Sequence, residues 1–244
     1  MRFGITKVMA KHRAAASAIG ANNQPQIDAA WQVKQHFEGA ENTRLNNARW
    51  TYADGRDINA VLQGQLAVLR NRCRYESGNN PFVRGVMESY AAAVIGQDGP
   101  GMQVESTDKR FVRALEKGWR AFSEDPDVSR DSSLTDLLHL QVRNLWDSGE
   151  FFLQHYMGAD GVRVNDIDPQ RIDNVMGSVQ SSADGTHTVM GVERSKYGRA
   201  RRYWVQNEVF GPWGVAPSGE YQAVRAEYMI HGRQAWFANQ VRGI

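Results

Sequence analysis

The 244-residue chain has little cysteine, no long apolar run and no strong charge of one sign. Its single cysteine, Cys73, excludes a disulfide framework within the chain and suits a reducing compartment. No segment approaches the roughly 20 apolar residues of a membrane-spanning helix, so no membrane partner is expected. The basic N-terminus is not a signal peptide, because the apolar stretch from Ala14 to Ala21 is too short and too weakly apolar.

Motifs for catalysis and for metal or cofactor binding are also lacking. Six histidines are scattered without metal-ligand spacing, and one cysteine cannot build a thiolate site. The sequence contains no Walker A motif and no nucleophile elbow. We therefore assign no catalytic residue, no metal ligand and no cofactor. The net charge of +2, from 29 basic and 27 acidic residues, also lacks the strong basic bias of many nucleic-acid binders.

What is present is ordered along the chain. Residues 1–50 lack periodicity and predict an extended or partly disordered N-terminal arm. Apolar residues at steps of three and four predict a mainly helical part over residues 51–149, and a period of two predicts a β-rich part over residues 150–244. Helices followed by strands predict the α+β fold class.

Four helices are predicted in the helical part. The first spans Asp57–Arg74, with an inward face that includes Leu66, Leu69 and Cys73 and an outward face that includes Arg70 and Arg74. The second begins at Asn80-Pro81, an N-cap followed by proline, and ends near Gly96. The third spans about 108–123, and four of its residues are predicted to face inward. The fourth follows a capping box at Ser133–Asp136. The four inward residues of the third helix are Phe111, Leu115, Trp119 and Phe122.

Five strands are predicted in the β-rich part, and Asp160-Gly161 is a hairpin signal between the first two. They are Glu150–Met157, Val162–Ile167, Thr188–Glu193, Tyr203–Gln206 and Tyr221–Arg225.

The densest basic cluster lies between the third and fourth predicted strands. One interpretation is contact with a phosphate backbone, and the favoured one is a solvated hairpin tip flanked by aromatic residues. The candidate DNA-backbone or interface contacts are Arg194, Lys196, Arg199, Arg201 and Arg202.

A second set of residues is a candidate for contacts between subunits. Arg70 and Arg74 share one helix face, where an interface salt bridge and a nucleic-acid contact are equally open interpretations. Trp236 is one of seven tryptophans, a residue type enriched at interfaces, although a core position is the alternative. Arg242 completes this set of candidate subunit-interface residues.

Carboxylates offer a weaker, catalytic hypothesis. Glu150 and Asp168 are the candidate pair for a hydrolase. Asp166 and Asp168 also look paired, but the favoured interpretation is a strand that ends in an Asp-Pro turn, where aspartate accepts backbone hydrogen bonds.

Several motifs, taken in order, resemble the lambda-like portal proteins of tailed bacteriophages. The matching segments are Leu69–Arg74, Asn79–Gly85, Val94–Gly96, Trp119, Asp147–Phe152, Ile167–Ile172, Gly191–Glu193 with Tyr197–Arg199, Met229–His231 and Gln240–Ile244. Each motif alone is weak, but their order matches the family over roughly residues 45–244.

The resemblance implies a structural subunit of the portal ring at one capsid vertex. In that family a homo-oligomeric ring, typically a dodecamer, forms the conduit for double-stranded DNA during packaging and ejection. The terminase large subunit docks during packaging, and capsid and head-tail connector proteins are further partners. The implied location is the virion, with the host cytoplasm during assembly.

The resemblance also locates this chain within the larger family protein. Family members continue past the segment that matches Arg242-Gly243-Ile244, into the channel and crown regions. The chain is therefore expected to supply mainly the peripheral wing region. A stand-alone nucleic-acid-binding protein that uses the basic cluster remains the alternative function.

Overall fold

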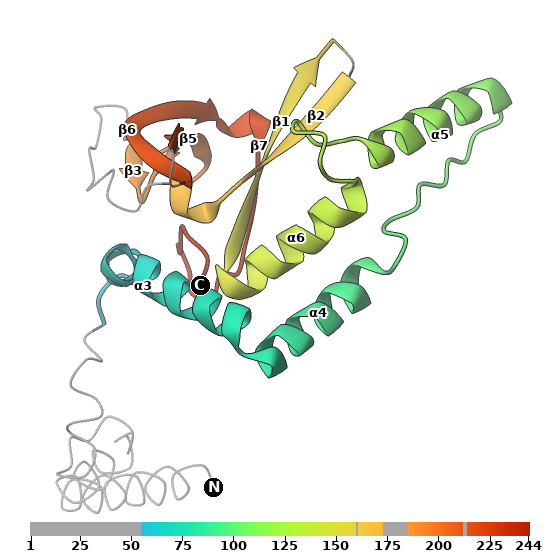
Figure 1. Ribbon diagram of the computed structural model, residues 1–244. Coiled ribbons are helices and arrows are strands. Elements are labelled where there is room, and N and C mark those ends of the chain that lie inside the picture. The colour runs from blue at the N-terminus through green and yellow to red at the C-terminus, as the bar shows by residue number, and fades with distance from the viewer. Residues whose placement is uncertain (1–54, 160, 173–184, 212–213) are drawn as a thin grey trace, which may run out of the picture. The chain divides into compact units, whose positions relative to one another are not determined.

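The computed structural model describes residues 55–159, 161–172, 185–211 and 214–244, so the predicted N-terminal arm lies outside the described residues. Four helices come first along the described chain, and seven strands with two short 3-10 helices follow (Figure 1). The helices are α3 (Ile58–Asn79), α4 (Pro81–Ile95), α5 (Lys109–Glu124) and α6 (Leu134–Asp147). This order of helices and antiparallel sheets confirms the predicted α+β class.

The helix boundaries follow from local capping chemistry. Asn80 separates α3 from α4, and its side chain accepts hydrogen bonds from the backbone N–H groups of Phe82 and Val83. Gly96 ends α4 at a φ of 80°, a conformation that glycine adopts at little cost. Ser133 and Asp136 form the predicted capping box of α6. These boundaries confirm the sequence predictions, except that α3 continues five residues beyond Arg74.

Two antiparallel sheets make up the β-rich part. The first has the strand order β2-β1-β7, with β1 (Glu150–Gly158) in the centre, β2 (Gly161–Ile167) on one side and β7 (Met229–Arg233) on the other. The second has the order β3-β4-β5-β6. Its strands are β3 (His187–Val189), β4 (Val192–Arg194), β5 (Ala200–Gly211) and β6 (Gly214–Arg225), and the 3-10 helices are η2 (Pro169–Arg171) and η3 (Ala226–Tyr228).

The sequence prediction was wrong about the stretch 188–193, which is a hairpin and not one strand. β3 and β4 pair through Val189 and Val192, and the turn between them consists of Met190 and Gly191. Both turn residues have positive φ, at 47° and 78°. Methionine is uncommon at a turn position with positive φ, so the residue type at this position did not predict a turn. Strand β7 was also missed.

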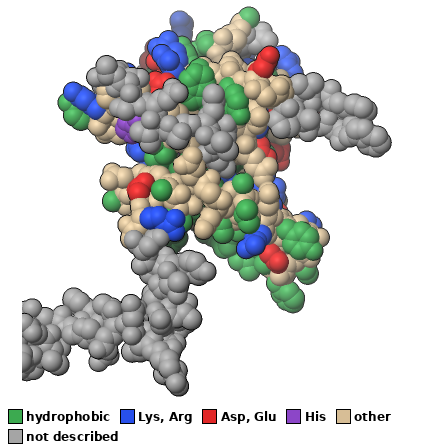
Figure 2. Space-filling model, turned by 90° about the vertical axis from the view of Figure 1, so that its left-hand side faces the viewer, with side chains coloured by type: hydrophobic (Ala, Val, Ile, Leu, Met, Phe, Trp, Pro, Cys, Tyr) green, Lys and Arg blue, Asp and Glu red, His purple; other side chains and the backbone are tan. Residues whose placement is uncertain are grey.

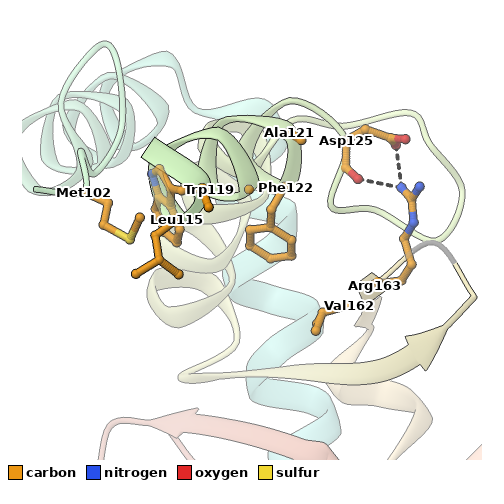
Figure 3. A pocket seen from close by; sticks show the side chains of 11 residues that line it. Met102, Leu115, Trp119, Ala121, Phe122, Asp125, Val162 and Arg163 are labelled. Atoms are coloured by element: carbon orange, nitrogen blue, oxygen red, sulfur yellow. Dashed lines mark hydrogen bonds and ion pairs between the residues drawn. The ribbon is translucent and has the colours of Figure 1, made fainter. Parts of the chain in front are cut away.

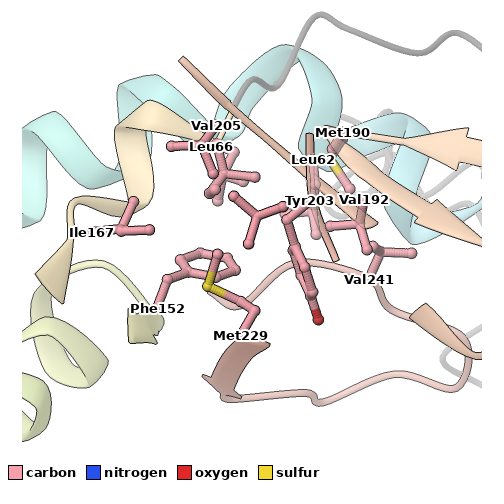
Figure 4. Close-up of a cluster of buried hydrophobic side chains, with 12 residues drawn as sticks. Leu62, Leu66, Phe152, Ile167, Met190, Val192, Tyr203, Val205, Met229 and Val241 are labelled. Carbon is pink, nitrogen blue, oxygen red and sulfur yellow. The ribbon is translucent and has the colours of Figure 1, made fainter. Parts of the chain in front are cut away.

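One core joins the helical part to both sheets. Leu62 and Leu66 of α3 pack into a buried cluster with Phe152 of β1 and Tyr203 and Val205 of β5 (Figure 4). The remaining buried members are Ile167, Ile172, Met190, Val192, Val224, Met229 and Val241. Because α3 lies against both sheets through these side chains, residues Arg56–Ile244 form one unit.

Two predicted helix faces differ from the structure. On α3 the buried residues are Leu62, Leu66 and Arg70, whereas Cys73 is exposed, so Arg70 lies on the inward face and not the outward one. On α5 no residue is fully buried, although its apolar side chains were expected to face the core. The apolar side of α5 instead lines an open groove, which is described below.

Candidate functional site

The carboxylate of Glu150, the first residue of β1, is completely buried and makes several hydrogen bonds. Its Oε1 accepts hydrogen bonds from Arg70 of α3 and, at 2.7 Å, from Nε of Arg242. Its Oε2 accepts from Nε2 of His231 on β7 and from the backbone N–H of Gly243, both at 2.9 Å. We call Glu150, Arg70, Arg242 and His231 the Glu150 cluster. It joins one helix, two strands and the segment that follows β7.

Backbone carbonyls satisfy the other donors of the two arginines. Arg242 donates to the carbonyls of Ile172, Met190 and Pro169 at 2.7–3.0 Å. Arg70 donates to the carbonyls of Ser148 and Pro169, both at 3.2 Å. Two guanidinium groups and one carboxylate leave one excess positive charge in the cluster. The carbonyl oxygens offset that charge, because their dipoles point at the guanidinium groups.

Burial and the hydrogen bond to Glu150 define the protonation of His231. Burial lowers the pKa of His231 below its ordinary value of 6.5, although the Glu150 carboxylate opposes this shift. The ring is therefore neutral at pH 7, with its Nε2–H donated to Glu150 and its Nδ1 free to accept from the Tyr203 hydroxyl at 3.5 Å. Phe152 stacks on the same ring at a centroid distance of 4.2 Å.

The charged members of the cluster stay ionised at neutral pH. Burial alone would raise the pKa of Glu150, but Arg242, the His231 hydrogen bond and Arg70 hold it well below its ordinary value. Burial lowers the pKa of Arg70 to about 10, which still leaves the guanidinium charged at pH 7. The cluster is thus a structural ion network, since its carboxylate is not poised to exchange a proton near neutrality.

The sequence made Arg70 and Arg242 candidates for a subunit interface, and in the structure both bind Glu150 inside the chain. Their side chains are 2% and 0% exposed, so they are not available to a second subunit. The physical reason is Glu150, whose buried charge requires cationic partners from the same chain. Arg70 continues the buried stripe of Leu62 and Leu66 at a step of four residues, and this spacing was the sequence signal for its inward position.

Arg74 lies one helical turn beyond Arg70 and binds Asp168 with two hydrogen bonds of 2.9 and 3.0 Å. Asp168 also accepts from the backbone N–H of Gln170 at 2.8 Å, which confirms the predicted Asp-Pro turn. Burial would raise the pKa of Asp168, but Arg74 lowers it overall. Glu150 and Asp168 therefore both serve as arginine partners, and neither has the raised pKa that favours an acid catalyst in the hydrolase hypothesis.

The basic cluster of residues 194–202 lies at the hairpin between β4 and β5. Several of its cations have partners within the hairpin or close to it. Arg194 donates to the carbonyl of Gly198 at 2.6 Å, and Arg202 lies 3.8 Å from Glu193. Lys196 lies over the Tyr197 ring at 4.9 Å, and Arg201 donates to Thr186. On the face shown in Figure 2, Lys and Arg side chains are spread among hydrophobic and acidic ones.

A groove of about 660 Å³ lies between α5 and the hairpin of β1 and β2. Leu115, Trp119 and Phe122 enter it from the helix, and Val162 enters it from β2 (Figure 3). Arg163 closes one end by binding Asp125 at 2.7 Å. The hydrogen bond from Arg163 lowers the pKa of Asp125 and outweighs the opposite effect of burial. The groove is mainly apolar, so it is suited to an apolar side chain.

The fold and these sites can be compared with known proteins. Residues 43–244 match the family model described as phage portal protein, lambda family. The chain belongs to this family. A curated relative, the probable portal protein of Halomonas phage phiHAP-1, is 24% identical over 219 residues. That match covers 85% of this chain and 42% of the relative, so the chain spans about two fifths of the relative's length.

The match covers every described element of this portal-family chain, from α3 to the segment after β7. Within the described ranges, no helix is long and apolar enough to cross a membrane. The described part of the chain also holds no group of three or more His, Cys, Asp and Glu side chains that is placed to bind a metal ion.

Proposed function

We propose that this chain is a structural subunit of the portal ring at the capsid vertex. The observation that carries the proposal is the family match over residues 43–244. The ring would form the conduit for double-stranded DNA during packaging and ejection. Any contact with that DNA would be electrostatic and independent of sequence, because a conduit must let every sequence pass.

The same proposal assigns partners and locations. The ring would be homo-oligomeric, with a dodecamer expected for the full-length protein, and it would offer docking surfaces to the terminase large subunit and to capsid and head-tail connector proteins. It would assemble in the host cytoplasm and remain in the virion. Support comes from the shared family, and the internal arginine partners of Glu150 and Asp168 favour a structural role over a catalytic one.

Subunits of a closed ring meet head to tail, so each subunit needs two different contact surfaces. One candidate surface is the outward stripe of α4, where Phe82, Val86, Tyr90 and Val94 recur at steps of four residues and are all exposed. Trp236, which is 74% exposed after β7, remains a candidate contact from the sequence. Contiguous exposed apolar residues of this kind often mark a site of contact with another protein.

Mass photometry and negative-stain electron microscopy of the purified chain would test the ring. The expected result is a closed ring whose mass is a fixed multiple of the 27.4 kDa subunit. Phe82→Glu should weaken assembly by placing a charge within the α4 stripe, because a buried unpaired carboxylate is costly. Tyr197→Glu is the matched control, since both aromatic side chains are more than four-fifths exposed.

One outcome would contradict the proposed ring, and another would contradict the α4 contact surface. A chain that stays monomeric at all accessible concentrations would remove the ring as a property of this chain. Equal loss of assembly in the Phe82 and Tyr197 variants would leave the ring but remove α4 as its contact surface.

A further inference from the structure

Helix α5 has two opposite faces, and within the described part of the chain one of them lies against the β1–β2 hairpin. At 3.6 residues per turn, Phe111, Leu115, Trp119 and Phe122 fall on one side. Three of these side chains point into the groove beside the β1–β2 hairpin (Figure 3). The opposite side of the helix is therefore turned toward solvent (Figure 1).

The solvent side of α5 is strongly basic. Its five cations fall within an arc of roughly 100° around the helix axis. All five are exposed, and none forms an ion pair with another residue of the described ranges. They are Lys109, Arg110, Arg113, Lys117 and Arg120, and we call this surface the α5 basic face.

The α5 basic face holds more than the whole net charge of the chain. Five cations less the two carboxylates of Glu116 and Glu124 give α5 a charge of +3. The chain as a whole carries +2, so the other residues together carry −1. The sequence had singled out residues 194–202 as the densest basic cluster, but several of those cations have partners near the hairpin, whereas the cations of α5 pair with none of the described residues.

The composition of the face indicates its ligand. A protein interface normally has an apolar or aromatic centre, and the α5 basic face has none. Lys109 and Arg120 are about 16 Å apart along the helix at 1.5 Å per residue. A row of cations of that length suits a ligand with regularly repeated negative charge, and duplex DNA carries one charge per roughly 1.7 Å of its axis.

We propose that the α5 basic face binds the phosphate backbone of double-stranded DNA without regard to base sequence. This choice of polyanion rests on the proposed portal function, whereas the separation of the two helix faces stands on the structure alone. The site is distinct from the sequence candidates at residues 194–202, and it lies opposite the apolar groove of the same helix.

The test is fluorescence anisotropy of the full chain with a random-sequence 30-base-pair duplex, titrated from 50 to 300 mM salt. The first variant replaces Lys109, Arg113 and Arg120 with Gln. The matched control replaces Lys196, Arg199 and Arg202 with Gln, which removes the same charge from an equally exposed hairpin. Gln has nearly the helix propensity of Lys and Arg, and circular dichroism would confirm that both variants fold.

The α5 variant should lose at least roughly tenfold in affinity at 50 mM salt, and the slope of log affinity against log salt should fall by about 2 to 3. The control should change both quantities much less. The inference would be overturned if the two variants lost affinity equally, if the unsubstituted chain failed to bind the duplex, or if it bound phosphatidylserine vesicles in preference to DNA.

Mass photometry of the same samples measures ring assembly independently of DNA binding, so the two proposals can be tested separately. Assembly with loss of DNA binding only in the α5 variant supports the DNA site and keeps the ring. If the chain never assembles but loses DNA binding only in the α5 variant, the site is supported and the ring is contradicted.

Discussion

Nε of Arg242 lies 2.7 Å from Oε1 of Glu150, and both side chains are completely buried. Their pairing secures the segment after β7 against the start of β1 and, through Arg70, against α3. A buried ion pair of this kind contributes less through its own attraction than through the penalty for losing one partner.

Glu150→Gln should therefore be strongly destabilising. Removal of the carboxylate charge leaves Arg70 and Arg242 buried without a counter-ion, and the expected loss is about 3–5 kcal/mol in the free energy of unfolding. Urea denaturation would measure it. Asp168→Asn is the control, because the Arg74–Asp168 pair is partly exposed and should lose about 1 kcal/mol or less. Similar losses in the two variants would contradict the central role of Glu150.

Acid should destabilise the fold in two stages. The folded pKa of His231 is below 6.5, so under about pH 6.5 the unfolded chain takes up a proton first, and stability falls until the folded pKa is reached. The folded pKa of Glu150 is below 4.5, so its contribution is present above pH 4.5 and is lost as the pH falls further.

His231→Gln should remove the first stage and keep the second, because an amide can still donate to Glu150 but does not titrate. Thermal unfolding midpoints from pH 8 to about pH 2 would compare the variant with the unsubstituted chain, so that the other titrating groups cancel. An unchanged slope between pH 6.5 and 4.5 would show that another group causes the first stage.

Truncation of phenylalanine to alanine should lower the free energy of unfolding strongly at one position and very little at another. Phe152 is fully buried between His231, Tyr203 and Arg242, so Phe152→Ala should cost about 3–5 kcal/mol in the free energy of unfolding. Phe82 is 85% exposed on α4, so Phe82→Ala should stay within about 0.5 kcal/mol for the monomer. Chemical denaturation at a concentration below assembly would measure both, and a large effect at Phe82 would contradict its exposed position in the monomer.

Substitution by alanine should destabilise the protein at one glycine and stabilise it at another. Gly149 has a φ of +73°, and a Cβ there would collide with the backbone of Ile244, so Gly149→Ala should lower the thermal midpoint. Gly64 is exposed within α3, and an added Cβ would meet no heavy atom within 4 Å, so Gly64→Ala should stabilise by about 0.5–1 kcal/mol. Differential scanning calorimetry would measure the thermal midpoints of both variants. A higher midpoint for Gly149→Ala would contradict the close approach of Gly149 to the backbone of Ile244.

Features set by neighbours in the sequence were predictable, and features set by distant partners were not. Asn80 and Ser133 mark helix starts through hydrogen bonds to residues two or three positions away, so both starts were found. Arg70 was assigned to the solvent face because a charged residue normally lies there. Its spacing from Leu62 and Leu66 points inward, but the counter-ion that makes its burial possible, Glu150, lies 80 residues away.

The same reasoning applies to α5 and to the second sheet. The spacing of Leu115, Trp119 and Phe122 located an apolar face correctly but did not reveal that the face lines an open groove. Met190 carries a positive φ that its residue type does not announce, so β3, the turn and β4 were predicted as one strand. The basic face of α5 was missed because its cations are spaced along a helix and do not form a dense run.

The Glu150 cluster also determines how late in translation the chain can complete its fold. Arg70 and Arg242 lie 80 residues before and 92 residues after Glu150. A growing chain therefore presents Glu150 with only one of its two arginines until translation has passed residue 242. Contacts of such long range slow folding, and the partly made domain would hold a Glu150 carboxylate without its hydrogen bonds from Arg242 and Gly243. Ribosome-bound chains stopped before Arg242 should accordingly remain sensitive to protease, with protection gained only after that arginine has emerged.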